Sequence, residues 1–414
     1  MALDKAKAAK KQIVGVLIDI GNSETRARIR YKPLKGLESV YPALDSYTFT
    51  LSNHYMSLGT DTDYEISPDY RNNSSTVLNI DGQRILHGEI VEREFRGRWD
   101  IPNGKGNKSD EAITEWTLHR VFLEVYRVLA EHWNIAITEV DVALNVYILL
   151  PPAEHLNAKD KMIDLIKNID EVIEMKPEGE ADYVPVAHTI LCNDIQTYPE
   201  GIAAFFGIRV DINGNKLTPN KAVERFMHGY VLVMDIGAGT TDLAIMKDSK
   251  LMSETRMSLP IAGNQIKASI KTNITNADPR LRLKLQTGIQ NMNSIMSTAM
   301  LDEEGLKAPI DCAIELGRAK EAFASSLTNS LRDYAEVHQD CLPLVTGVLV
   351  VGGANITARR NGEVVSPPVE SYILPKLSAY MDDAELVPIG DRDARYLNLD
   401  GLESVYITNM SKMG

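Results

Sequence analysis

The feature that most constrains this chain is a short pattern that occurs twice. Residues 15–26 read GVLIDIGNSETR, and residues 230–242 read YVLVMDIGAGTTD. Each copy is an apolar run that ends in an aspartate, Asp19 or Asp235, and continues through a tight turn of small residues into a second run. An uninterrupted apolar run is typical of a buried central strand. The sequence therefore predicts two strand hairpins of one design.

The turns of these hairpins carry residue types that suit a metal-bound phosphate chain. A carboxylate at a strand end suits Mg²⁺, which keeps several waters and takes few protein ligands. Glycine lets the backbone approach closely, and turns with free N–H groups form anion-binding concavities. Arg26 lies where a cation would reach a phosphate, as a P-loop lysine does. The candidate phosphate contacts are Gly21, Asn22, Ser23, Thr25, Arg26, Gly237, Gly239, Thr240 and Thr241.

A purely structural explanation is open for each turn, because a single Asp-x-Gly hairpin is usually no more than a turn. Two aligned copies, each after a buried-strand run, favour a shared function instead. The chain has no Gly-x-x-x-x-Gly-Lys-Ser/Thr run, so it does not use a Walker-type loop. We therefore expect the two hairpins to face one another across one phosphate site.

Two further segments are candidates for the nucleoside end of such a site. Residues 347–351 are an apolar run followed by a glycine-rich turn that can lie flat against a base or an α-phosphate. The residues of this turn are Gly352, Gly353, Ala354 and Asn355. Residues 315–323 predict a helical stretch. Its Lys320 and Glu321 either meet a ribose or base or lie on a solvated charged face.

A fifth segment, residues 197–206, predicts the opening of a buried helix. Pro199 is compatible with a first helical turn, and a carboxylate at Glu200 suits the positive end of the helix dipole. Stabilisation of that terminus is the simpler role for Glu200, and a contact with the phosphate site is the functional one.

Taken in order, these segments resemble the ATPase superfamily of actin, heat-shock chaperones and sugar kinases. Residues 19–26 and 235–242 are similar to its two phosphate motifs, and residues 352–355 are similar to its adenosine motif. The helix opening at Glu200 is similar to its first connecting segment, and residues 318–321 are similar to part of its second connecting helix. Within the superfamily, the YPE run at 198–200 is similar to that of the plasmid-segregation actins, the ParM-like proteins. Arg26 replaces their usual lysine, and a planar guanidinium is not equivalent to a point ammonium.

The resemblance implies an α/β, actin-like ATPase fold in which two ribonuclease-H-like domains flank a nucleotide cleft and each carries a smaller subdomain. It implies that ATP and its product ADP bind with Mg²⁺, which Asp19 and Asp235 hold mostly through water. Glu200 would position or polarise the water that attacks the γ-phosphate. Catalysis would then be mainly positioning and electrostatics. Asp19, Glu200 and Asp235 are therefore the candidate catalytic residues.

The chain length of 414 residues favours two domains. We expect residues 13–225 to form the first, with a small subdomain inserted at about 33–108 and the C-terminal residues 370–414 returning to it. Residues 226–369 would form the second, with a helical subdomain at about 263–338.

Composition narrows the setting. The net charge of −13 disfavours direct adhesion to DNA or to anionic membranes. Three widely separated cysteines, Cys192, Cys312 and Cys341, are typical of a reducing compartment and no disulfide framework. The first dozen residues lack the apolar region of a secretion signal. We expect a cytoplasmic bacterial protein that makes no direct contact with nucleic acid or membrane.

Three functional hypotheses follow. The first is a polymerising ATPase whose filaments of like subunits move plasmid or phage DNA through a DNA-binding adaptor on a centromere-like site. The second is a kinase for a sugar or small acid, although the sequence shows no recognisable acceptor pocket. The third is a weakly hydrolytic scaffold that uses ATP as a switch. The set of motifs, the length and Glu200 after Tyr198-Pro199 favour the first.

Overall fold

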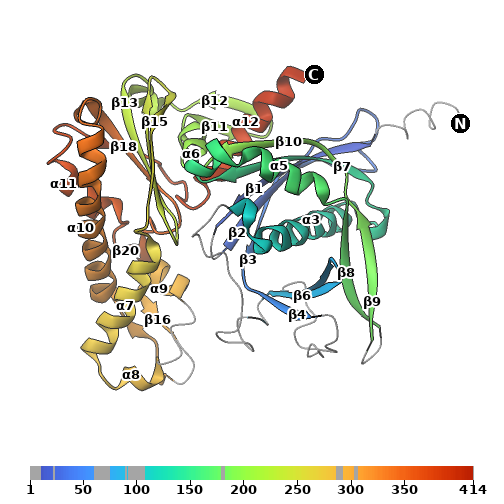
Figure 1. Cartoon of the computed structure of the whole chain (residues 1–414), viewed down its shortest axis with the longest axis horizontal. Coiled ribbons are helices and arrows are strands. Elements are labelled where there is room, and N and C mark those ends of the chain that lie inside the picture. The colour runs from blue at the N-terminus through green and yellow to red at the C-terminus, as the bar shows by residue number, and fades with distance from the viewer. Residues whose placement is uncertain are drawn as a thin grey trace, which may run out of the picture.

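The computed structural model describes residues 11–21, 24–59, 75–88, 91, 108–178, 182–285, 292–302 and 306–413. Its two large sheets follow one plan, with strand orders β3-β2-β1-β7-β10 and β15-β14-β13-β18-β21. In each sheet three consecutive strands form an antiparallel meander. A later strand pairs in parallel with the first of the three, and a second later strand pairs in parallel with that one. The duplication that the sequence predicts is therefore a duplication of whole sheets, one in each half of the molecule (Figure 1).

The strands of the two large sheets have matching positions in the two halves. The first sheet comprises β1 (Gln12–Ile20), β2 (Glu24–Tyr31), β3 (Leu44–Ser52), β7 (Val142–Leu150) and β10 (Cys192–Pro199). The second comprises β13 (Tyr230–Ile236), β14 (Thr241–Lys247), β15 (Lys250–Leu259), β18 (Val345–Val351) and β21 (Glu385–Leu386). The predicted hairpins are β1–β2 and β13–β14, and the central strands are nearly continuous buried runs, as their composition requires.

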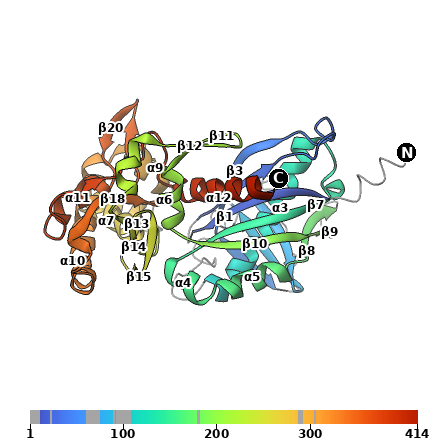
Figure 2. The same ribbon diagram turned by 90° about the horizontal axis from the view of Figure 1, so that it is seen from above.

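Two helices lie between the large sheets, and each packs on a different sheet. They are α6 (Ile202–Ile208) and α12 (Leu397–Met413). Phe205 and Ile208 of α6 join the core of the second sheet, while Leu399 and Leu402 of α12 pack on the first. Figure 2 shows α12 running from one half to the other.

The crossing of these helices depends on a glycine. A Cβ atom at Gly401 would lie 1.7 Å from the carbonyl oxygen of Ala203, so only glycine fits. The second connecting helix is therefore α12, and the assignment of residues 318–321 to that role is wrong. Those residues lie in α10 (Ala313–Val337), whose apolar face is buried within the second half.

A small antiparallel sheet forms the subdomain of the first half, in the order β4-β6-β5-β8-β9. Its strands are β4 (Tyr55–Gly59), β5 (Ser75–Ile80), β6 (Gln83–Gly88), β8 (Glu171–Glu178) and β9 (Asp182–Thr189). The predicted insertion at 33–108 is wrong in two respects, because β3 belongs to the large sheet and residues 171–189 contribute two strands. Helices α3 (Ala112–Trp133), α4 (Pro152–Asn157) and α5 (Lys159–Asn168) complete this half.

The subdomain of the second half is mainly helical, as the sequence predicts. It contains α7 (Gly263–Ala277), α8 (Leu281–Lys284), α9 (Met292–Thr298) and α10, with the short strands β16 (Met300–Leu301) and β17 (Ile310–Asp311). The remaining elements are β11 (Val210–Asn213), β12 (Lys216–Pro219), β19 (Ala358–Arg360), β20 (Glu363–Ser366) and α11 (Glu370–Leu377).

The C-terminal segment divides between the two halves. Ile373 and Leu377 of α11 join the second core, so residues 370–414 do not return to the first half as a unit. Only α12 packs on the first sheet. The residue boundaries of the two domains otherwise stay a prediction. Within the described ranges, the helices are too short or too polar to span a membrane.

Candidate functional site

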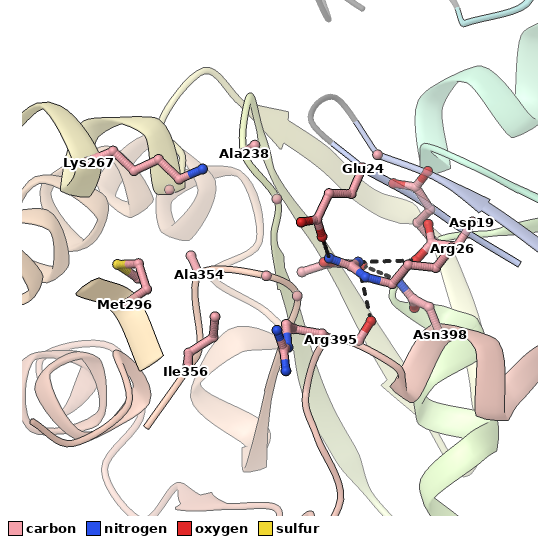
Figure 3. Close-up of a pocket in the computed structure, with 17 residues that line it drawn as sticks. Asp19, Glu24, Arg26, Ala238, Lys267, Met296, Ala354, Ile356, Arg395 and Asn398 are labelled. Carbon is pink, nitrogen blue, oxygen red and sulfur yellow. Dashed lines mark hydrogen bonds and ion pairs between the residues drawn. The ribbon is translucent and has the colours of Figure 1, made fainter. Parts of the chain in front are cut away.

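A pocket of about 860 Å³, part of it open to solvent, lies between the two hairpins. Both repeated aspartates, Asp19 and Asp235, line it, so the two copies of the motif meet at one site. Its lining residues are Asp19, Gly21, Glu24, Arg26, Glu200, Asp235, Gly237, Ala238, Gly263, Lys267, Met296, Gly352, Gly353, Ala354, Ile356, Arg395 and Asn398. Charged side chains gather at the hairpin end, and Met296, Ala354 and Ile356 lie at the other (Figure 3).

The two hairpin turns are closed by matching backbone hydrogen bonds. The amide of Gly21 donates to the carbonyl of Glu24 at 3.0 Å, and the amide of Gly237 donates to that of Thr240 at 2.9 Å. Each turn therefore closes over the same number of residues and places its aspartate at the same point of the strand. Asn22 and Ser23, two of the predicted phosphate contacts, lie outside the described residues.

The paired threonines of the hairpins support the turns and do not line the pocket. Thr25 is fully buried and donates to the side chain of Asn53 at 2.8 Å, and Thr241 donates to the carbonyl of Ile261 at 2.6 Å. Each acceptor follows the third strand of its meander, so both hydroxyls fasten the turn to the next segment of the sheet. Phosphate contact by these two residues stays a prediction.

Glycines leave room at the centre of the pocket. Gly352 has φ +94°, and a Cβ there would lie 2.5 Å from Oδ1 of Asp235. Gly201, with φ +68°, lets the chain turn sharply between Glu200 and α6. The helix begins at Ile202, so Pro199 is the last residue of β10 and Glu200 precedes the helix. The prediction of a first helical turn at Pro199 is wrong.

Four carboxyl groups converge beside the pocket. Burial, with Asp19 and Asp235 nearby, raises the pKa of Glu200 to about 7 against the opposing charge of Lys108. Burial likewise raises the pKa of Asp235 and of Asp242 to about 7, and it raises that of Asp19. Removal from water disfavours the charged forms, and like charges at close range add to that effect. The cluster is therefore poised to accept a cation.

The start of α12 organises one side of this cluster. The side chain of Asn398 donates to Oδ2 of Asp235 at 2.8 Å and accepts from the amide of Gly201 at 3.0 Å. One amide thus links the second hairpin to the turn that presents Glu200. Sequence reasoning missed Asn398, because nothing in the order of the chain places residue 398 beside residue 235.

Arg26 is the cation of the first hairpin. Its guanidinium donates to Glu24 at 3.1 Å, lies 3.9 Å from Oδ2 of Asp19 and stacks over the ring of Tyr396, 5.7 Å from the ring centre. It also donates to the backbone carbonyl of Arg395 at 3.4 Å. The side chain is therefore held at the edge of the pocket, and its contact with a phosphate stays a prediction.

Other predicted contacts lie elsewhere. Lys320 is fully buried and donates to the carbonyls of Ile356 and Pro367 at 2.8 and 2.7 Å, so it neither lines the pocket nor lies on a solvated face. Asn355 braces the adenosine-like turn by binding Glu370 at 2.8 Å. Gly239, Thr240 and Glu321 are absent from the lining residues among the described part of the chain.

Several site residues carry no sequence signal that we could use. Besides Asn398, they include Lys108, Lys267 and Arg395. Asp242 ends the second motif, and its alignment with Arg26 in the first copy was the available clue to its position. Lys267 lies one turn into α7, which follows β15, and its side chain extends into the pocket (Figure 3).

A nucleotide with a divalent cation fits these residues. The buried carboxyls with raised pKa favour a cation, and the glycines leave the space that a phosphate chain needs. Across the described residues, no three His, Cys, Asp or Glu side chains form a metal cage of their own. Mg²⁺ commonly binds through one or two carboxylates, waters and substrate phosphates.

Comparisons with known proteins identify the fold. No protein-family model and no curated protein sequence matches the chain. Among solved structures, actin-like protein Alp7A matches with a TM-score of 0.62 at 15% identity, covering 97% of this chain and 98% of that one. Bacillus thuringiensis ParM with ATP matches at 0.59 and 14%, covering 98% and 100%. Ta0583, an archaeal actin homolog, matches at 0.56 and 16%, covering 96% and 100%.

These likenesses extend over nearly the whole chain, so the protein has an actin-like ATPase fold. The matching structures include ParM proteins, Alp7A and an archaeal actin homolog. The predicted α/β fold class is confirmed.

Proposed function

We propose that the protein is a filament-forming actin-like ATPase that polymerises with Mg-ATP and segregates plasmid or phage DNA through a DNA-binding adaptor. The observation that carries this proposal is the convergence of both hairpins and Glu200 on one pocket. The fold supports it, and Bacillus thuringiensis ParM, which shares the fold, has been solved with ATP.

In this proposal the phosphate chain of ATP lies between the hairpin turns, and the base lies toward Met296 and Ile356. Arg26 neutralises phosphate charge from the first half. Asp19 and Asp235 would hold Mg²⁺, mostly through water, and the metal would neutralise charge that develops on the phosphates. Both halves contact one ligand, so a change in that ligand is able to change the angle between them.

Glu200 is the residue that we propose positions the attacking water. It lies in the turn between β10 and α6, and its carboxyl lines the pocket. A group that transfers protons works best when its pKa is near the operating pH, which suits a carboxyl with a pKa of about 7.

The net charge of −13 fits a filament that reaches DNA through an adaptor and does not bind the phosphate backbone directly. Copies of the protein itself and an adaptor on a centromere-like site are thus the partners that we propose. A cytoplasmic, bacterial setting follows from this role.

Light scattering and phosphate release by the purified chain test the proposal. With Mg-ATP, scattering should rise above a critical protein concentration and phosphate release should accompany it. A solution that stays clear well above micromolar protein in several salts contradicts the filament. Hydrolysis that needs an added sugar or acid indicates a kinase, and a monomer held by one fixed partner indicates a scaffold.

Variants at the site separate the assigned roles. Glu200→Ala should slow phosphate release by about 10²-fold or more and leave ATP binding and assembly largely intact. Asp19→Ala and Asp235→Ala should instead weaken Mg-ATP binding, measured with a fluorescent nucleotide. Normal hydrolysis by Glu200→Ala contradicts the role of that residue.

A further inference from the structure

Lys108 reaches Glu200 from a separate part of the chain. It opens the short 3-10 helix Lys108–Asp110, which precedes α3. Its ammonium donates to Oε1 of Glu200 at 2.5 Å and also donates to the backbone carbonyl of Ile20. The lysine therefore joins the turn that carries Glu200 to the end of β1, directly after Asp19.

The backbone of Lys108 is itself held in place. The carboxylate of Glu154 in α4 accepts the amides of Lys108 and Ser109, each at 2.8 Å. Glu154 is 4% exposed, and the side chains of Lys108 and Glu200 are 11% and 13% exposed. Two charge-assisted bonds to the backbone thus aim a buried ammonium at one oxygen of Glu200.

A buried ion pair is an uncertain source of stability, because the desolvation of both charges offsets much of their attraction. Burial opposes the charge of Lys108, but Glu200, with Asp19 and Glu154, raises its pKa above the ordinary value. The ammonium is therefore charged, and it gives the carboxylate of Glu200 a fixed hydrogen-bond partner. It takes one carboxylate oxygen, and none of the described residues binds the other, Oε2, which can accept a hydrogen bond from a water.

We propose that Lys108 is a positioning residue for ATP hydrolysis, which holds the carboxylate of Glu200 in the orientation that receives the attacking water. This inference rests on the proposed function. Lys108 acts through Glu200, so its loss should lower kcat and leave the KM for ATP nearly unchanged.

Three single variants of the full chain test the inference first, by steady-state phosphate release. Lys108→Met should lower kcat by about 10- to 100-fold, with KM within about threefold of the unaltered protein. Lys108→Arg, which keeps the charge and the donors, should recover part of the rate. Lys161→Met is the matched control, because Lys161 pairs with Asp110 of the same short helix but is 59% exposed. Its kcat should not change.

Glu200→Gln provides the decisive measurement. If Lys108 acts through Glu200, then Lys108→Met added to Glu200→Gln should lower kcat no further. If the two substitutions lower kcat independently, so that their fold-losses multiply in the double variant, the inference is overturned. A Lys108→Met protein with normal kcat also overturns it. If the Lys108→Met protein fails to fold, Lys108→Gln replaces it in the same comparison, because glutamine keeps a hydrogen-bond donor without the charge. An unaltered protein without ATPase activity refutes the proposed function instead.

Discussion

The two hairpins share a backbone but not a charge pattern. Their registers are identical, so that Asp19 pairs with Arg26 across β1–β2 and Asp235 pairs with Asp242 across β13–β14. The first hairpin therefore carries its own counter-charge, while the second places two carboxyls side by side. A duplicated scaffold has become an asymmetric site, in which one half supplies a fixed cation and the other needs one.

The difference continues along the second strand of each hairpin. Arg28 and Arg30 of β2 bind Glu403 of α12, and Arg28 also binds Asp400 at 2.9 Å. The matching residues of β14 are Ala244 and Met246, which pack in the apolar core against α6. The seam with α12 is thus partly ionic, and the seam with α6 is apolar. The same strand position can therefore carry a charged or an apolar side chain, provided that the helix packed on it carries an opposite charge or an apolar surface.

The ionic seam gives the largest expected effect on stability. Glu403→Leu leaves two buried arginines without their shared carboxylate, so the unfolding free energy should fall by about 3–5 kcal/mol. Replacement of Arg28, Arg30 and Glu403 together by apolar residues of similar size should recover most of that loss, because the second half already uses an apolar seam. Urea unfolding followed by circular dichroism measures both. If the triple variant is as unstable as Glu403→Leu, the two seams are not interchangeable.

The helix crossing, where the seams meet, gives the next effect. Gly401→Ala should cost about 1–3 kcal/mol, because its methyl group would overlap the backbone of α6. Gly317→Ala in α10 is the control: its Cβ would meet only the Tyr372 hydroxyl, at 3.4 Å. That change should be neutral or stabilising, since alanine favours a helix by about 1 kcal/mol over glycine. If both variants lost the same free energy of unfolding, the close approach at the helix crossing would have no special role in stability.

The doubly acidic hairpin predicts a pH dependence in nucleotide-free protein with a chelator present. The pKa values of Asp235 and Asp242 are raised to about 7 on folding, so the folded state binds more protons than the unfolded state above pH 4. Stability should be greatest below the unfolded pKa and fall as pH rises through about 7. Asp242→Asn should flatten this decline in Tm. A Tm that rises between pH 5 and 8 in the unaltered protein is the opposite result.

Arg26→Lys gives the smallest expected effect. It keeps the charge of the first hairpin but loses the stacking on Tyr396 and part of the forked hydrogen bonding. ATP affinity, measured by fluorescent-nucleotide titration, should fall by only several-fold, whereas Arg26→Met should weaken it further. Equal affinities for the lysine and methionine variants would show that the charge at position 26 does not contact phosphate.

Most of the fold prediction came from local sequence patterns. The prediction was wrong where segments that are far apart in the chain pack together. The hairpins and the buried strands follow from apolar runs within a few residues. The small sheet of the first half pairs β5 with β8, from segments that lie far apart in the sequence. The assignment of residues 318–321 to a connecting helix is wrong for the same reason, since only the packing of α12 on α6 shows which helix crosses between the halves.

The site divides in the same way. Asp19, Arg26, Glu200, Asp235 and the glycines at 352 and 353 could be named because each lies within a motif that has a local chemical reason. Lys108, Asn398 and Asp242 act through partners that only the fold brings near them. Lys320 was assigned from its neighbours in a helix, but its ammonium is turned into the core.

By itself, the sequence determined that two strand hairpins with terminal aspartates exist and that each is buried along its apolar run. Tertiary structure alone decided that they face one pocket and that Lys108 and Asn398 complete it. The physical reason is that strand formation depends on near neighbours and on the burial of apolar side chains. Charge, pKa and ligand geometry depend instead on distances across the folded chain.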